Sequence, residues 1–354
     1  MKFIGILLFS FSGFLYCETE FHMSNDFNIY YNDITGEGKG SSSLTEGWNY
    51  IDVLNINGSG RKDNISYNYN LGVKFTDDKR NDVKNISLMN ITGSFKKGYN
   101  LITAGDIFES FSQYSLASSL KGASYKFLKE ESKLPEITAI FGHTYPRWDS
   151  YFKDPDTRVL KRQAYGLKLK ENLGDFNLGV NYLNTKDIEL MSESEKYDSS
   201  NYSLDLKYNP FAGLELTGEY ARSDTDEKIS NKSFKGDAYR FEFVGDADPS
   251  RITIEYENVE PDYLSLLGSA VSDRRKVKAR WRYKYSKMTT INAGVLWYRD
   301  NLENQKTDTT YTIRPDISIG IKKIFARRQY SYVNFSYKFD RKYGPILKKI
   351  ISLT

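Results

Sequence analysis

Apolar and polar side chains alternate along most of the chain after residue 20. Within residues 65–75, every odd position is apolar or aromatic and every even position is polar or glycine. The pattern recurs at 176–182, 202–208, 277–285, 313–321 and 333–339. Successive side chains of a β-strand point to opposite faces, whereas an amphipathic helix needs apolar residues spaced by three and four. The sequence therefore predicts an all-β fold whose strands have two different faces.

About seventeen segments show this alternation, and most approach the roughly 9–11 residues that a tilted membrane strand needs. Strands of soluble proteins usually have only about 5–6 residues. The predicted strands are residues 21–31, 48–58, 64–75, 85–96, 99–106, 119–128, 135–144, 161–171, 175–185, 200–209, 213–223, 234–244, 249–259, 272–286, 288–300, 308–323 and 327–340. Their length favours a barrel in a membrane over a soluble β-sandwich, which also alternates.

The connections between these segments alternate in length. Short connections lie at 60–63, 97–98, 172–174, 210–212 and 286–287, and longer ones at 32–47, 76–84, 107–118, 145–160, 186–199, 224–233, 260–271 and 301–307. Outer-membrane barrels have short periplasmic turns and longer outer loops. The rhythm therefore predicts that the strand at 21–31 runs outward from the periplasm.

An odd number of strands conflicts with the even number that is usual in bacterial single-chain barrels. The only segment left to supply another strand is 346–354, which alternates poorly and has no aromatic residue at its end. We therefore expect an antiparallel transmembrane β-barrel of about 18 strands, with 16 as the alternative and with a weak or truncated last strand.

The composition agrees with a barrel in which only every second residue meets lipid. Hydrophobic residues make up 39% of the chain, yet aromatic residues reach 15%, with 28 Tyr and 21 Phe. The near balance of 50 basic and 46 acidic residues argues against a nucleic-acid partner. A single Cys and two His leave little for thiol or metal chemistry, so we expect no metal and no cofactor.

The first residues predict a secretory signal. Met1 and Lys2 give a positive start, and residues 3–15 are almost continuously apolar. That run is shorter than the roughly 20 residues of a spanning helix and matches the hydrophobic region of a signal peptide. We expect residues 1–17 to be removed and residues 18–354 to form one barrel domain. Lipid attachment at Cys17 is the alternative, although Tyr16 departs from the usual lipoprotein pattern.

Charged side chains gather on the face that is predicted to line the lumen. One strand carries a basic ladder of Lys276, Lys278, Arg280, Arg282 and Lys284. The acidic residues predicted for the same surface are Asp205, Glu215, Glu219, Glu242, Glu255 and Glu257. A basic stripe in a lumen raises the local anion concentration and favours anion passage. The alternative is that opposite charges on neighbouring strands satisfy one another across the sheet.

The third outer connection, residues 107–118, is more apolar than an exposed loop should be. A loop of this composition is a candidate to fold into the barrel and narrow it. The residues assigned to such a constriction are Phe108, Glu109, Phe111, Gln113 and Tyr114. The alternative is that the connection continues its two flanking strands above the membrane.

An enzymatic barrel needs a catalytic His beside Ser or Asp at its outer rim. His22 and His143 are the only histidines, and the predicted strands place them at opposite ends of the barrel. Asp149 and Ser150 follow His143 in a predicted loop, but a single His at a strand end is usually structural. With no P-loop, Gly-rich phosphate motif or paired-carboxylate motif, we expect no enzymatic activity.

With its signal, its alternation and its long–short rhythm, the chain resembles bacterial outer-membrane β-barrel proteins of porin type. The third outer connection is similar in position to the constriction loop of general porins. The resemblance implies a place in the outer membrane of a Gram-negative bacterium, contact with lipid and lipopolysaccharide, and compatibility with a homo-oligomer. It implies a channel for passive diffusion of small hydrophilic solutes, and the basic ladder adds an expected bias toward anions. The alternative function is a structural or interaction barrel: a surface receptor, an adhesin, or the membrane component of a secretion or assembly machine.

Overall fold

The computed structural model describes residues 18–128, 134–145, 147–148, 161–189, 196–322, 332–338, 340–343 and 349–350. The predicted signal peptide with Cys17 lies outside the described residues. So do most of the predicted outer connection 145–160 and most of the predicted closing segment 346–354.

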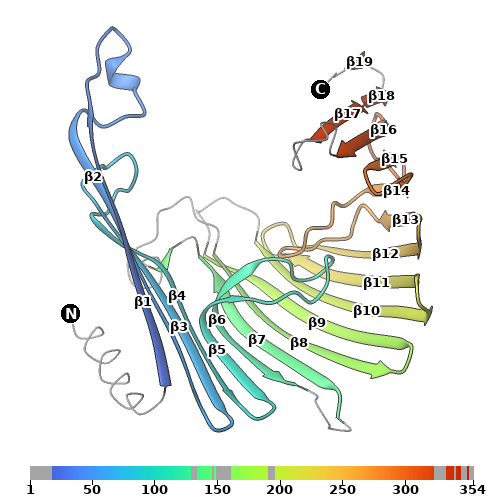
Figure 1. Cartoon of the computed structure of the whole chain (residues 1–354), viewed down its shortest axis with the longest axis horizontal. Coiled ribbons are helices and arrows are strands. Elements are labelled where there is room, and N and C mark those ends of the chain that lie inside the picture. Colours follow the sequence, from blue (N-terminus) through green and yellow to red (C-terminus); the bar gives the residue numbers. More distant parts are fainter. Residues whose placement is uncertain are drawn as a thin grey trace. The chain divides into compact units, whose positions relative to one another are not determined.

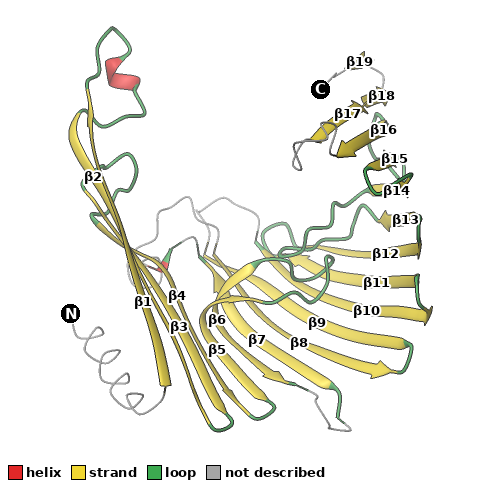
Figure 2. Cartoon of the chain, viewed as in Figure 1, coloured by secondary structure: helices red, strands yellow, loops and turns green. Residues whose placement is uncertain are grey.

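Long strands make up nearly all of the described chain (Figure 2). They are β1 (Glu18–Asn32), β2 (Gly47–Lys62), β3 (Ile65–Thr76), β4 (Ile86–Lys97), β5 (Asn100–Phe108), β6 (Ser119–Phe127), β7 (Glu136–Thr144), β8 (Lys161–Leu173), β9 (Phe176–Glu189), β10 (Tyr197–Phe211), β11 (Leu214–Glu227), β12 (Lys232–Ala247), β13 (Ser250–Val259), β14 (Arg274–Lys284), β15 (Thr289–Arg299) and β16 (Tyr311–Lys322). The helical geometry in the described residues includes a turn of 3-10 helix, η2 (Lys39–Ser41), and Trp148 is also helical. No described helix is long and apolar enough to cross a membrane.

Strands that follow one another in the chain pair antiparallel, which confirms the predicted all-β antiparallel fold. The predicted length of the loop at 224–233 is wrong. β11 and β12 continue pairing as far as Glu227 and Lys232, so only residues 228–231 connect them. Polar and charged cross-strand pairs extend this hairpin beyond the alternating segment, which is why the alternation alone did not mark its end.

The end of the sheet is less regular than its beginning. β17 (Tyr332–Lys338) and β18 (Asp340–Tyr343) both pair with β16, so they are successive segments of one strand position. β19 (Lys349–Ile350) has two residues and pairs with β18. Among the described residues, these short segments are all that corresponds to the predicted weak end of the barrel.

The chain divides into two compact units. The first consists of Met1–Glu109, Ser118–Gly166 and Lys186–Ser194, and the second of Ser110–Ala117, Leu167–Thr185 and Glu195–Thr354. In the second unit, β10 to β13 lie side by side as a continuous sheet (Figure 1). Segment 110–117 groups with this sheet although it connects two strands of the first unit.

The sheet of the second unit has two chemically different faces. The apolar face exposes large side chains, among them Leu204, Leu206, Phe241, Phe243, Ile252 and Ile254, which are 38–58% accessible. The charged face carries Glu219, Arg240, Glu242, Glu255, Glu257 and Lys276, which occupy the intervening positions. An exposed apolar surface of this extent is unusual for a soluble protein and fits the predicted contact with lipid. The strand period therefore sets which residues meet lipid and which are available for function.

Candidate functional site

The strand register brings carboxylates and basic groups into direct opposition on the charged face. Arg240 of β12 lies opposite Glu257 of β13, and Glu257 lies opposite Lys276 of β14. Glu255 is placed in the same way between Glu242 and Lys278. The three strands β12, β13 and β14 place these charged side chains in one patch, because each strand contributes alternate residues to the same face.

These residues form a connected network of ion pairs. Lys276 Nζ lies 2.9 Å from Glu255 Oε1 and also pairs with Glu257. Arg240 pairs with Glu242, and its guanidinium lies 3.6 Å from Glu255 Oε2. Lys278 is at the edge of the network, 4.0 Å from Glu255. The acidic and basic groups therefore neutralise one another over this part of the face, as the alternative interpretation expected.

The other half of the basic ladder is different. Arg280 lies opposite Thr253 and Gly294, and Arg282 lies opposite Arg251 and Asn292, so neither faces a carboxylate across the sheet. Both side chains are exposed, and neither forms an ion pair with any described residue. The last member, Lys284, pairs with Asp248 at 3.0 Å. Uncompensated positive charge is thus concentrated at Arg280 and Arg282.

Two of the remaining predicted acidic residues lie side by side on the same face, with Asp205 of β10 opposite Glu219 of β11. Asn181 donates a hydrogen bond to Asp205 at 2.9 Å. Glu215 is farther along β11 and pairs with Lys207 at 2.7 Å. The structure thus places the predicted acidic residues on this face, and their role in lining a lumen stays a prediction.

Segment 110–117 packs onto the charged face. Phe111, Tyr114 and Leu116 are buried, with Tyr114 and Leu116 fully inaccessible. Tyr114 Oη and Gln113 Nε2 both donate to Glu257 Oε1, at 3.1 and 3.2 Å. The flanking strands end at Phe108 and begin again at Ser119, so this connection does not continue them as a hairpin.

Lys168 of β8 holds the start of the segment. Its Nζ donates to the backbone carbonyls of Phe111 and Ser110, at 2.8 and 3.2 Å. Just before the segment, Glu109 pairs with Lys126 at 2.8 Å and accepts a hydrogen bond from Ser124 at 3.1 Å. Phe108 remains 71% exposed. Of the five residues predicted for a constriction, Phe111, Gln113 and Tyr114 belong to the packed segment.

A second loop, residues 260–273, packs against segment 110–117 and is hydrogen-bonded to it. Tyr263 Oη donates to the carbonyl of Tyr114 at 2.7 Å, and the two rings meet edge to face at 6.0 Å. The backbone of Ser269 donates to Gln113, and that of Ala117 donates to Leu267, both at 2.9 Å. From the sequence, the Pro and Asp residues of this loop indicate only a turn and no function.

Small residues on the charged face make room for the two tyrosines. Tyr114 and Tyr263 form a buried cluster with Ala221, Ala238 and Val259. At Gly236, an added Cβ would lie 2.2 Å from the backbone nitrogen of Tyr263. Ala221, Gly236 and Ala238 stand where the strand pattern calls for polar side chains. These small residues are the signal in the sequence for a docked loop, and no prediction was drawn from them.

A row of glycines crosses the strands that lead into segment 110–117. Gly105 lies opposite Gly122, and Gly122 lies opposite Gly142. Gly105 has a φ of 106°, which favours glycine, and an added Cβ at Gly122 would lie 2.0 Å from the carbonyl oxygen of Phe141. The strands approach one another closely here, which side chains would prevent.

Of His143, Asp149 and Ser150, the residues considered for an enzymatic site, the structure describes only His143. His143 at the end of β7 lies between the rings of Phe141 and Tyr145, at 5.5 and 5.6 Å, while Asp149 and Ser150 lie outside the described residues. No group of three His, Cys, Asp or Glu among the described residues is arranged to hold a metal ion.

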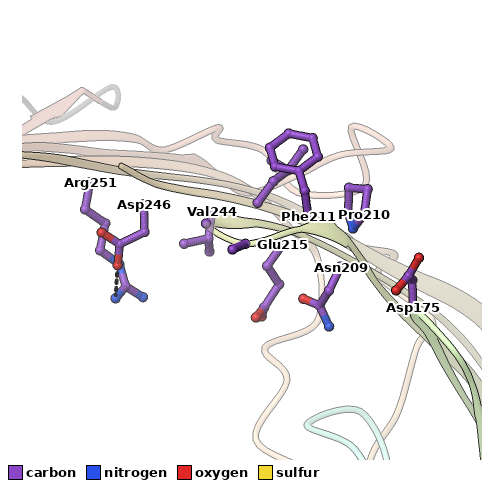
Figure 3. A pocket seen from close by; sticks show the side chains of 11 residues that line it. Asp175, Asn209, Pro210, Phe211, Glu215, Val244, Asp246 and Arg251 are labelled. Carbon is purple, nitrogen blue, oxygen red and sulfur yellow. Dashed lines mark hydrogen bonds and ion pairs between the residues drawn. The ribbon is translucent and has the colours of Figure 1, made fainter. Parts of the chain in front are cut away.

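A shallow pocket lies at the short-turn end of the second unit. It is lined by the turn residues Pro210, Phe211 and Ala212, with Glu215 and Arg251 on the flanking strands. Figure 3 shows Arg251 paired with Asp246, at 3.1 Å, and Phe211 on the opposite side from Glu215. The basic side chain that lines this pocket, Arg251, is paired with Asp246, so the pocket lacks the free positive charge found at Arg280 and Arg282.

No protein-family model matches the chain, and no curated protein sequence matches it. Solved structures do match it over most of its length. OccAB2 of Acinetobacter baumannii is 11% identical, with 92% of this chain and 93% of that chain covered and a TM-score of 0.51. The chain has the fold of a porin-type outer-membrane β-barrel.

Two further structures are similar at lower scores. OccK2 (OpdF) of Pseudomonas aeruginosa, crystallised in complex with glucuronate, is 10% identical, with 92% of each chain covered and a TM-score of 0.49. A BenF-like porin from Pseudomonas fluorescens Pf-5 is 9% identical, with 92% of this chain and 94% of that chain covered and a TM-score of 0.47. At such identities the likeness concerns the fold alone.

Proposed function

We propose that the protein is a channel in the bacterial outer membrane for passive diffusion of small hydrophilic solutes, with a bias toward anions. The porin-type fold supports the place in the membrane, because the apolar face fits lipid and leaves the charged face for a water-filled lumen. In this proposal residues 18–354 form the mature barrel after removal of residues 1–17, and the solute crosses without chemical change. Outer-membrane lipid and lipopolysaccharide surround it, and a homo-oligomer is compatible with it.

The observation that carries the anion bias is the pair Arg280 and Arg282. Lys276 and Lys278 are engaged by carboxylates, so they add little to the field that a passing solute meets. Exposed guanidinium groups without a carboxylate partner attract anions and present donors that match carboxylate or phosphate groups. Segment 110–117 supports a narrowed passage, because it covers part of the charged face.

Reversal potentials in planar bilayers test the bias. In a salt gradient, we expect the wild-type channel to favour the anion and the double variant Arg280→Gln/Arg282→Gln to lose most of that preference. The matched control is Lys228→Gln/Lys235→Gln, which removes the same charge from the outer end of β11 and β12, where the lysines pair with Asp226 and Asp224. Cation selectivity of the wild type contradicts the anion bias.

The docked segment also keeps the alternative function open, since a loop that covers a lumen suits a receptor or assembly barrel as well. Single-channel recordings separate the two functions. Stable conductance steps support the channel. Silence from a protein that still shows the heat-modifiable migration of a folded barrel supports the structural or interaction barrel.

A further inference from the structure

Two arginines face each other on the apolar side of the second unit. Arg275 of β14 lies directly opposite Arg299 of β15 in the strand register. Arg275 lies two residues before Val277 on β14, and Arg299 lies two residues after Trp297 on β15. Residues two apart in a strand share a face, so both arginines belong to the apolar face. Like charges directly opposite each other destabilise a sheet unless something compensates them.

The pair lies at a defined height on this face. At the level of the arginines, the register places Asn258 beside Arg275 and Tyr311 beside Arg299. The next level toward the middle of the strands holds Tyr256, Val277 and Trp297. Aromatic residues followed by basic residues mark the boundary between the hydrocarbon core and the lipid headgroups. The arginines are on the side of the long connections, which the rhythm assigns to the outside.

Among the residues that the structure describes, no carboxylate pairs with either arginine. Arg275 Nε donates to the amide oxygen of Asn258 at 2.9 Å, and Arg299 Nε is buried with no acceptor among the described residues. Neither guanidinium forms an ion pair within the described chain.

The neighbouring acidic residues are already engaged. Asp273 pairs with Lys306, and Asp300 Oδ1 accepts the backbone N–H of Thr310 at 2.6 Å. Glu260 Oε2 accepts the backbone N–H of Asp237 at 2.8 Å. None of these three carboxylates forms an ion pair with Arg275 or Arg299, so the arginine pair is open to an anion from outside the chain.

We propose that Arg275 and Arg299 bind the phosphate group of a membrane lipid in the outer leaflet. Each guanidinium presents a planar fork of N–H donors that matches a phosphate, and two forks on neighbouring strands hold one phosphate from both sides. A lipid rather than free phosphate is the occupant, because Val277, Trp297 and Ile313 continue the apolar face directly below and support its acyl chains. This site is separate from the lumen and does not depend on solute transport.

Native mass spectrometry of the full-length folded protein, titrated with lipid A, measures this binding. We expect Arg275→Gln/Arg299→Gln to weaken lipid A binding about tenfold or more. The matched control is Arg222→Gln, which removes a guanidinium from the same face of β11 that is already paired with Asp237 at 3.4 Å. The control should bind lipid A as the wild type does.

Equal affinity of the double variant and the wild type overturns the proposal, as does an equal loss in Arg222→Gln. Inorganic phosphate, titrated alone and then in competition, distinguishes the two sources of phosphate. Displacement of lipid A by low millimolar phosphate assigns the site to the free ion and overturns the lipid assignment. If the double variant loses the heat-modifiable migration of a folded barrel, Arg275→Gln and Arg299→Gln are measured separately, and each is expected to bind several-fold more weakly.

Discussion

Glu257 connects the ion network of the sheet to segment 110–117. One of its oxygens accepts hydrogen bonds from Tyr114 and Gln113, while the carboxylate also pairs with Lys276. Hydrogen bonds to a charged acceptor are stronger than neutral ones, each contributing about 1.5–3 kcal/mol. Neutralising this one side chain therefore weakens the attachment of the segment and the balance of the network together.

We expect Glu257→Gln to loosen segment 110–117 without unfolding the barrel. The single-channel current should become noisier and its mean conductance should rise, because the segment samples positions away from the charged face. Glu215→Gln is the control, since Glu215 pairs with Lys207 on the same face but does not contact the segment. A quiet current of unchanged size from Glu257→Gln contradicts this role.

Asp82, in the connection between β3 and β4, makes the stability of the fold depend on pH. Burial alone would raise the pKa of Asp82, but hydrogen bonds from Lys74, at 2.8 Å, and from Arg147 lower it well below its usual range. A lowered folded-state pKa stabilises the fold above the unfolded value of about 3.9, and this contribution is lost as the pH falls through the folded-state value.

The comparison of Asp82→Asn with the wild type tests the direction of this pH dependence of stability. At pH 7 the variant should lose its heat-resistant gel migration roughly 2–4 °C below the wild type. The gap should narrow as the pH is lowered beneath about 4, because the Asp82 carboxylate of the unfolded wild type then takes up a proton while that of the folded protein, with its lowered pKa, stays charged. A constant gap from pH 7 to pH 3 would rule out the carboxylate as its source.

At the scale of elements, the row of Gly105, Gly122 and Gly142 in the first unit leaves little space for a side chain. We expect Gly122→Ala to reduce the yield of folded barrel sharply, because the new Cβ has no space beside the backbone of β7. Gly93→Ala is the control within the same sheet, since an added Cβ there meets nothing within 4 Å. Refolding yield from urea into detergent, scored by heat-modifiable migration, measures both. Equal yields would show that the strands can separate to admit a side chain.

Most strands could be predicted from the sequence, since a period of two over many residues is a strong local signal. The predicted segment 64–75 and the observed β3 (Ile65–Thr76) differ by one residue at each end. The error at 224–233 arose because polar strand ends outside the membrane lose the alternation while their backbone pairing continues. Alternation reports burial in lipid, and backbone pairing extends beyond it.

The candidate site was less accessible to sequence reasoning because it depends on pairings between distant residues. The basic ladder was visible on one strand, but its division into neutralised lysines and free arginines follows from the register with β13. The hydrogen bond between Tyr263 and Tyr114 joins residues 149 positions apart. Only the small residues Ala221, Gly236 and Ala238 hinted at it from within the sequence.

At the scale of the whole molecule, the docked segment is separable from the barrel wall. We expect a chain in which Gly-Gly-Ser replaces residues 110–117 to fold and to conduct more than the wild type, because the strand pairings lie outside the segment. A matched replacement of residues 33–46, another outer connection, should leave conductance nearly unchanged. Bilayer recordings of both chains measure the difference. Lower conductance in the first chain would mean that the segment holds the lumen open.

The distance in sequence between Tyr114 and Glu257, 143 residues, has a consequence for the order of assembly. The segment is made early in synthesis, but the residues that hold it belong to strands that are made much later. Contacts between such distant residues form late because a long loop must close first. The sheet is therefore built first, and segment 110–117 reaches its place on the charged face only at the end of folding.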